Sequence, residues 1–149
     1  MSGIRAIVCV AVLAGSSGIA AAQAEQGADK GVFGIGIIVG EPTGVSAKLY
    51  LGGDSNMAVD AAAGSAVVGG GLQAHADVLW HPFILTDEDS FVLPAYGGVG
   101  LRLLDAGGRT VSDFHVGIRG VVGILFDFKT VPLDAFVEVA GVLDWVFSD

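Results

Sequence analysis

The chain has 149 residues, of which 52% are hydrophobic, only 15% are charged and 24 are glycine. Sixteen acidic residues against seven Lys and Arg give a formal charge of −9 at neutral pH. The length favours a single domain, the lack of a Lys/Arg cluster excludes a nucleic-acid footprint, and the apolar composition excludes a disordered chain. A mean hydropathy of +0.69 combined with so much glycine favours β-structure in contact with lipid over helices.

Residues 1–24 have the pattern of an export signal. Arg5 supplies the positive charge, residues 6–14 (AIVCVAVLA) form a short apolar run, and the small-residue pattern AQA ends at Ala24. The apolar run is far shorter than the roughly 20 residues that a membrane-spanning helix needs. The sequence therefore predicts cleavage after Ala24 and a mature barrel domain of residues 25–149.

Cys9 is the only cysteine and lies within this apolar run, so the mature chain is predicted to have no disulfide and no thiol chemistry. Every later apolar stretch is interrupted by Gly, Pro or a charge before it reaches the length of a spanning helix. If the mature chain lies in a membrane, only a closed β-barrel can satisfy its backbone hydrogen bonds there.

Seven strand-length runs follow the predicted leader, separated by turn residues. They span residues 31–40, 45–51, 57–65, 72–80, 91–104, 114–128 and 133–147. The longest predicted loop is residues 81–90, which contains Pro82 and the acidic triplet at 87–89. Most runs are long enough for the roughly 9–11 residues of a tilted membrane-spanning strand.

Side chains in these runs separate by parity, because successive residues of a strand face opposite sides. In six of the runs every ionisable residue falls on one parity, and the other parity carries none. We expect these residues to pair inside a barrel, since an unpaired buried charge is costly. The predicted lumen charge network comprises Lys48, Asp60, His75, Asp77, Arg102, His115, Arg119, Glu138 and Asp144.

Aromatic residues lie on the apolar parity, at or near the ends of the runs. Aromatic girdles at both membrane interfaces are typical of the outward face of membrane barrels. The predicted girdle comprises Phe33, Trp80, Phe91, Phe114, Phe128 and Trp145.

A soluble sheet also alternates, but its polar face is normally rich in Lys and Glu. Here that face carries one Lys, two Arg, two His and a few acids, with Tyr, Ala and Gly between them, which suits a crowded lumen. The predicted fold is therefore an all-β, antiparallel up-and-down transmembrane β-barrel of about eight strands. The interior of such a barrel is just filled by side chains, so no open pore is expected.

Three segments carry a resemblance to a known family: residues 36–44 (GIIVGEPTG), 75–81 (HADVLWH) and 131–144 (VPLDAFVEVAGVLD). With these motifs the chain resembles the small outer-membrane β-barrel proteins of Gram-negative bacteria. The resemblance covers nearly all of the predicted mature chain. It implies a barrel of about eight strands in the outer membrane, and it implies no particular chemistry.

The end of the sequence departs from the pattern of these barrels, which have an even strand number and close with a strand ending in an aromatic residue. After residues 131–144 only Trp-Val-Phe-Ser-Asp follows. Either the last run bends into a short eighth strand, or the closing strand is missing from this sequence. A missing strand would leave an open edge in lipid, which is costly.

Chemistry candidates are weak. The glycines around residues 34–40 lack the dinucleotide spacing, and no helix follows them. His75 and Asp77 share a parity and could reach one metal ion, with His81 or His115 as further candidates, but spacing identifies no third ligand. The serines that could act as nucleophiles lie in no known motif: Ser46, Ser65, Ser90 and Ser112.

The sequence therefore predicts a non-enzymatic outer-membrane barrel with a structural or surface-interaction role. Outer-membrane lipid is the expected partner, and neither a cofactor nor a metal is expected. Two alternatives stay open. One is a soluble secreted or periplasmic barrel whose apolar parity lines a cavity for an apolar ligand. The other is an outer-membrane enzyme that modifies lipid.

Overall fold

The computed structural model describes residues 4–14, 32–51, 56–67, 70–106 and 113–148, and these form one antiparallel sheet in the order β1-β8-β7-β6-β5-β4-β3-β2. The strands are β1 (Ile4–Ala14), β2 (Phe33–Ile38), β3 (Thr43–Leu51), β4 (Met57–Ser65), β5 (Leu72–Asp87), β6 (Phe91–Asp105), β7 (Asp113–Phe128) and β8 (Asp134–Ser148). From β2 to β8 each strand pairs with the next one along the chain, in the up-and-down order that the sequence predicts. In the described residues, no helix is long and apolar enough to cross a membrane.

The seven predicted runs coincide with β2–β8, but one boundary is wrong. Residues 81–90 were expected to form a loop, whereas β5 continues to Asp87. The ladder with β6 shifts between Trp80 and Phe83 and again between Ile84 and Thr86. Pro82 lies in the first of these bulges, where a residue without a backbone N–H interrupts no ladder bond. A proline that predicts a loop is thus accommodated within a long strand.

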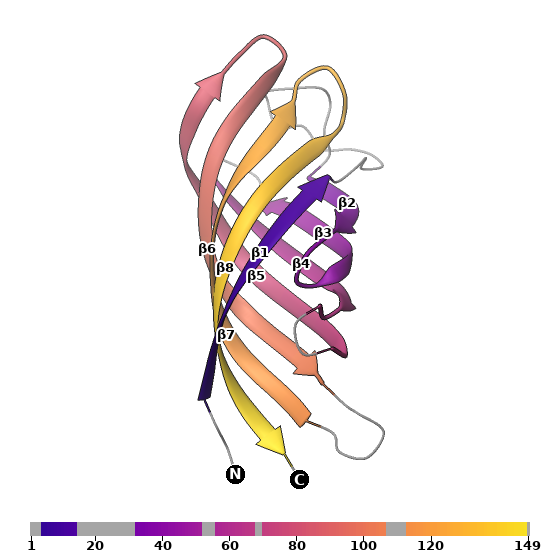
Figure 1. Cartoon of the computed structure of the whole chain (residues 1–149). Coiled ribbons are helices and arrows are strands. Elements are labelled where there is room, and N and C mark those ends of the chain that lie inside the picture. The colour runs from indigo at the N-terminus through magenta and orange to yellow at the C-terminus, as the bar shows by residue number, and fades with distance from the viewer. Residues whose placement is uncertain (1–3, 15–31, 52–55, 68–69, 107–112, 149) are drawn as a thin grey trace.

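Residues Ile4–Ala14, within the predicted export signal, form an additional strand that pairs with β8 along its whole length. Their Ile and Val residues suit an extended strand as well as they suit the apolar run of a leader. In Figure 1 this strand, drawn in indigo, runs beside β8 and upward from the end of the molecule where both chain termini lie.

The sheet curls strongly, so that strands distant in its order approach across the concave face. The Tyr50 hydroxyl on β3 donates a hydrogen bond to Asp134 on β8 (3.4 Å), and the Lys48 ammonium lies 5.0 Å from the centre of the Phe136 ring on β8. The edge strands β1 and β2 are in contact, but no hydrogen-bonded ladder joins them within the described part of the chain. The coarse architecture is therefore a curled antiparallel sheet with two edges.

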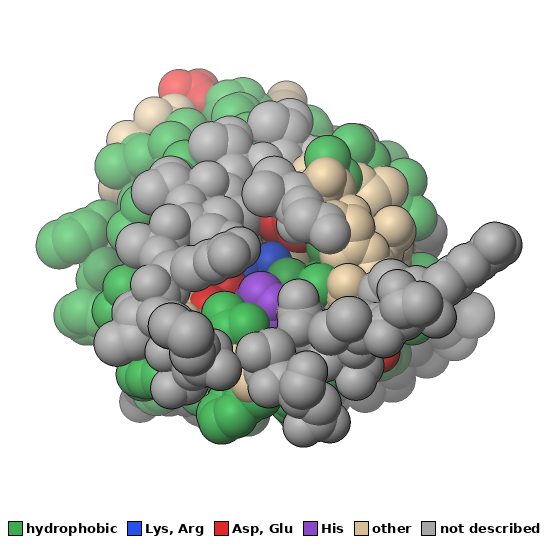
Figure 2. All heavy atoms as spheres, turned by 60° about the horizontal axis from the view of Figure 1, so that its bottom comes forward, with side chains coloured by type: hydrophobic (Ala, Val, Ile, Leu, Met, Phe, Trp, Pro, Cys, Tyr) green, Lys and Arg blue, Asp and Glu red, His purple; other side chains and the backbone are tan. Residues whose placement is uncertain are grey.

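Charged and apolar residues are distributed in the reverse of the usual way. Arg102 and Arg119 are almost completely buried on the concave face, with 0% and 2% of their surface exposed. Their outward-facing neighbours Leu101 and Ile118 are 60% and 51% exposed. Figure 2, seen toward the end with the chain termini, shows acidic, basic and histidine side chains at the centre and hydrophobic side chains around the periphery. The apolar parity is thus the convex surface.

Candidate functional site

The polar interior of the curled sheet is the most developed site of the molecule. Of the nine residues predicted to form a charge network, eight are buried: Asp60, His75, Asp77, Arg102, His115, Arg119, Glu138 and Asp144. The ninth, Lys48, is partly exposed, although its ammonium nitrogen is buried. All nine therefore lie on the same side of the sheet, and two arginines organise their contacts.

Arg102 on β6 connects three elements at the end of the sheet nearer the chain termini. Its Nη1 lies 2.7 Å from an Asp144 carboxylate oxygen on β8, and its Nη2 donates to the Gln73 side-chain oxygen on β5 at 2.7 Å. The carboxylate of Glu41, in the turn between β2 and β3, lies 3.5 Å from the same Nη2. Hydrogen-bonded charge pairs of this kind are stronger than neutral hydrogen bonds.

Arg119 on β7 forms the second centre. Its Nε lies 2.7 Å from an Asp77 carboxylate oxygen on β5, and its Nη2 lies 2.5 Å from Glu138 on β8. The second oxygen of Glu138 accepts a hydrogen bond from the Tyr96 hydroxyl at 2.9 Å. One guanidinium on β7 thus joins a carboxylate on β5 to a carboxylate on β8 across the concave face of the curled sheet.

Lys48 lies toward the opposite end of the interior, in an aromatic environment. It is opposite Asp60 in the β3–β4 register, and its ammonium lies 5.1 Å from the centre of the Tyr96 ring. The His81 ring is packed against Tyr96 and Tyr50, with centroids 5.3 and 6.2 Å away. Cation–π attraction stabilises a buried ammonium that has aromatic faces within about 6 Å.

Glycines on the inner parity provide the space for these large side chains. A Cβ atom added at Gly100 would overlap Asp77, one at Gly117 would overlap Asp144, and one at Gly123 would overlap the Tyr96 ring. Glycine within a strand often marks such close approaches. Several of the chain's many glycines are therefore part of the interior packing.

We expect Gly117→Val to destabilise the folded chain by about 1–3 kcal/mol, the usual cost of overpacking, because the new side chain displaces Asp144 from Arg102. Gly120→Val is the matched control, since Gly120 lies three residues away on the convex face with open space around it. Urea unfolding followed by tryptophan fluorescence measures both variants. Equal stabilities would contradict the described packing at Gly117.

A metal site is a weaker interpretation of the same residues. The potential ligand atoms of Asp60, His75 and Asp77 lie within 4.8 Å of one another, and all three residues are buried. However, Arg119 already brings a positive charge to this group, 2.7 Å from Asp77 and 3.4 Å from His75. A metal ion there would have to displace the guanidinium. The donor set therefore fits an ion-pair network better than a metal centre.

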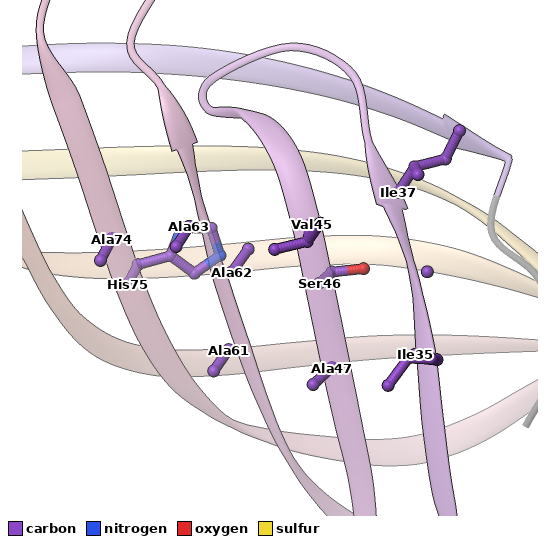
Figure 3. A pocket seen from close by; sticks show the side chains of 11 residues that line it. Ile35, Ile37, Val45, Ser46, Ala47, Ala61, Ala62, Ala63, Ala74 and His75 are labelled. Carbon is purple, nitrogen blue, oxygen red and sulfur yellow. The ribbon is translucent and has the colours of Figure 1, made fainter.

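The candidates Ser46 and His75 do not form a nucleophile–base pair. Ser46 and His75 line the same open hollow of about 680 Å³ over β2–β5, seen in Figure 3 with its mainly Ala, Ile and Val lining. Their register partner Ala62 lies on the strand between them, so their backbones are roughly 10 Å apart at about 4.8 Å per strand. The His75 nitrogens face Arg119 and Asp77 instead. Ser112 lies outside the described residues.

The predicted aromatic residues fall near both ends of the sheet. Phe114 and Trp145 lie toward the end where β7 begins and β8 ends, and Phe91 pairs with Phe128 at the opposite end. The remaining two, Phe33 and Trp80, lie in the half of the sheet nearer to that opposite end. Phe33, Trp80, Phe114 and Trp145 are exposed on the convex surface, and Phe91 and Phe128 are half-buried.

Several interior residues were not predicted as members of the network, among them Glu41, Gln73, Tyr96 and Phe136. Glu41 is buried and accepts a hydrogen bond from the Val67 backbone N–H at 2.8 Å. It belongs to a turn, and parity predicts nothing for turn residues. Gln73, Tyr96 and Phe136 lie on the inner parity, so extending the parity test to uncharged residues could have identified them.

No protein-family model, no curated protein and no solved structure matches this chain. The class of molecule that fold and site define is thus a curled, all-β antiparallel sheet with a charged interior and an apolar exterior.

Proposed function

We propose that this chain is a small outer-membrane β-barrel whose interior is filled by ion pairs and whose role is structural or surface-interacting. One observation carries the proposal: ionisable side chains including Arg102, Arg119 and Asp144 are buried on the concave face, while Val, Leu and Ile side chains cover the convex face. A convex surface so apolar is unstable in water and stable in the hydrocarbon core of a bilayer. The aromatic residues near both ends of the sheet support the same orientation.

Export through the predicted leader, a closed barrel and the resemblance to small outer-membrane barrels of Gram-negative bacteria all belong to this proposal. The interior supports a role without transport, because two arginines and their carboxylate partners occupy the space that a pore would need. The soluble alternative requires the apolar parity to line a cavity, and this parity lies on the outside here. For the lipid-modifying enzyme, the candidate nucleophile Ser46 and the candidate base His75 are separated by the strand that carries Ala62.

The test is a gel shift of the full chain refolded in detergent micelles, with boiled and unboiled samples compared. We expect a β-rich species whose migration changes on boiling, because a closed barrel resists SDS until it is heated. A chain that folds in plain buffer and shows no heat-dependent shift would overturn the membrane proposal.

We also expect the refolded protein to produce no discrete conductance steps in a planar lipid bilayer, because the ion-pair network fills the interior. The measurement is a single-channel recording at moderate salt, with protein-free detergent as the control. Stable steps of the size typical of general porins would contradict a side-chain-filled lumen.

A further inference from the structure

Strands β2–β8 leave a gap of one strand between β8 and β2, and β1 lies in this gap beside β8. An even number of antiparallel steps leads from β2 to β8, so these two strands run parallel to each other. A single strand antiparallel to both is what completes an all-antiparallel barrel, and β1 runs antiparallel to β8. Without such a strand, β8 presents unpaired backbone N–H and C=O groups along one side. In a bilayer, each such group costs several kcal/mol.

The register at this gap specifies the chemistry of its occupant. Ile4–Ala14 pairs with β8 over 11 residues, and Arg5, its one charged residue, lies opposite the buried Asp144. Every other residue of the segment is apolar. Asp144 and Glu138, the β8 partners of the two interior arginines, lie on the strand that borders this position.

From this geometry we infer that the side of β8 facing away from β7 is a strand-acceptor site, which Ile4–Ala14 occupies as long as the leader is attached. Its occupant in the processed chain is a polypeptide strand of the same chemistry, apolar throughout except for a basic residue opposite Asp144. This inference rests on the proposed barrel. A second copy of β8 fits less well, because self-pairing about its central residue Gly141 would place Glu138 opposite Asp144.

Seating of the strand is tested in the full chain by disulfide capture. Cys9 is the only cysteine and lies opposite Ala140, so Ala140→Cys places two cysteines directly opposite each other in the β1–β8 ladder. Oxidation with copper–phenanthroline is expected to join the two thiols nearly completely. Val139→Cys, one residue away and therefore on the other face of the sheet, is the control and is expected to react at least tenfold less.

A second pair of cysteines tests the same register in case the Ala140→Cys chain fails to fold. Val8 lies opposite Gly141, where open space surrounds the glycine, so Val8→Cys with Gly141→Cys in a Cys9→Ser background tests the same register. If neither pair forms a disulfide although the chain shows the heat-dependent gel shift, the acceptor inference is wrong and the barrel proposal stands. If the full chain shows no heat-dependent shift, the barrel proposal itself fails.

The decisive experiment tests whether an added peptide can replace the strand Ile4–Ala14. A site-specific protease sequence is placed between residues 15 and 31 of the Ala140→Cys chain, which is cut after oxidation and then reduced. A labelled peptide of residues 4–14 is added and oxidation is repeated. We expect the thiol introduced at position 140 to capture this peptide, and to capture the Arg5→Glu peptide at least tenfold less. Failure of the first peptide to enter, or equal capture of both, would overturn the acceptor site and its charge rule.

Discussion

Replacing Arg119 with methionine is expected to lower the free energy of unfolding by about 3–5 kcal/mol, the usual cost of removing one partner from a buried ion pair. The substitution keeps much of the side-chain volume, so the loss is mainly electrostatic. It leaves Asp77 and Glu138 buried without the guanidinium that lies 2.7 and 2.5 Å from their carboxylates. Urea unfolding in detergent micelles, followed by the fluorescence of the two tryptophans, measures the change.

Lys129→Met is the matched control for this prediction. Lys129 pairs with Asp87 near the ends of β7 and β5, where both side chains are partly exposed. Exposed ion pairs contribute at most about 1 kcal/mol, because water and salt screen them. If the two variants lose the same stability, Arg119 is not part of a buried network.

Val122→Arg is expected to destabilise the protein in a lipid bilayer by about 2–4 kcal/mol, the cost measured for a basic side chain on the lipid face near the bilayer midplane. Val122 is exposed on the convex face and lies about midway along β7, between Phe114 and Phe128. In the proposed membrane orientation, a guanidinium there has no water and no interior carboxylate within reach. Unfolding in phospholipid vesicles measures the effect.

Thr130→Arg, in the turn after β7, is the control for the bilayer experiment. Thr130 is exposed and lies beyond the strand end, so we expect a change within about 0.5 kcal/mol, as for most surface substitutions. A Val122→Arg protein as stable as this control would show that the convex face meets water.

Much of the fold could be predicted from the sequence, because strand alternation and turn residues are local signals. The parity of Lys48, Arg102 and Arg119 places all three on one face, and turn residues separate β2–β8 at nearly the observed positions. The same signals failed at Pro82, because a bulge in β5 accommodates a residue that usually ends a strand. They also did not predict that Ile4–Ala14 pairs with β8, because an apolar run without alternation fits a leader equally well.

The pairing within the interior could not be predicted, because it depends on how the curled sheet brings distant strands together. Arg102 contacts Glu41, 61 residues earlier in the chain, and no local pattern relates these two positions. The role of Gly117 in making space for Asp144 likewise appears only when the stagger between β7 and β8 is known. Parity therefore predicts which residues face inward, and the register determines which of them meet.

In the proposed membrane orientation, the convex face contacts lipid while the charges lie inside. The most direct measurement uses a nitroxide spin label at Val122→Cys in a Cys9→Ser chain reconstituted into vesicles, with Thr130→Cys as the reference. We expect the label at position 122 to be accessible to molecular oxygen and protected from a water-soluble nickel chelate, with the opposite order at position 130. If the nickel chelate reaches the label at position 122 as readily as the label at position 130, the proposed membrane orientation is wrong.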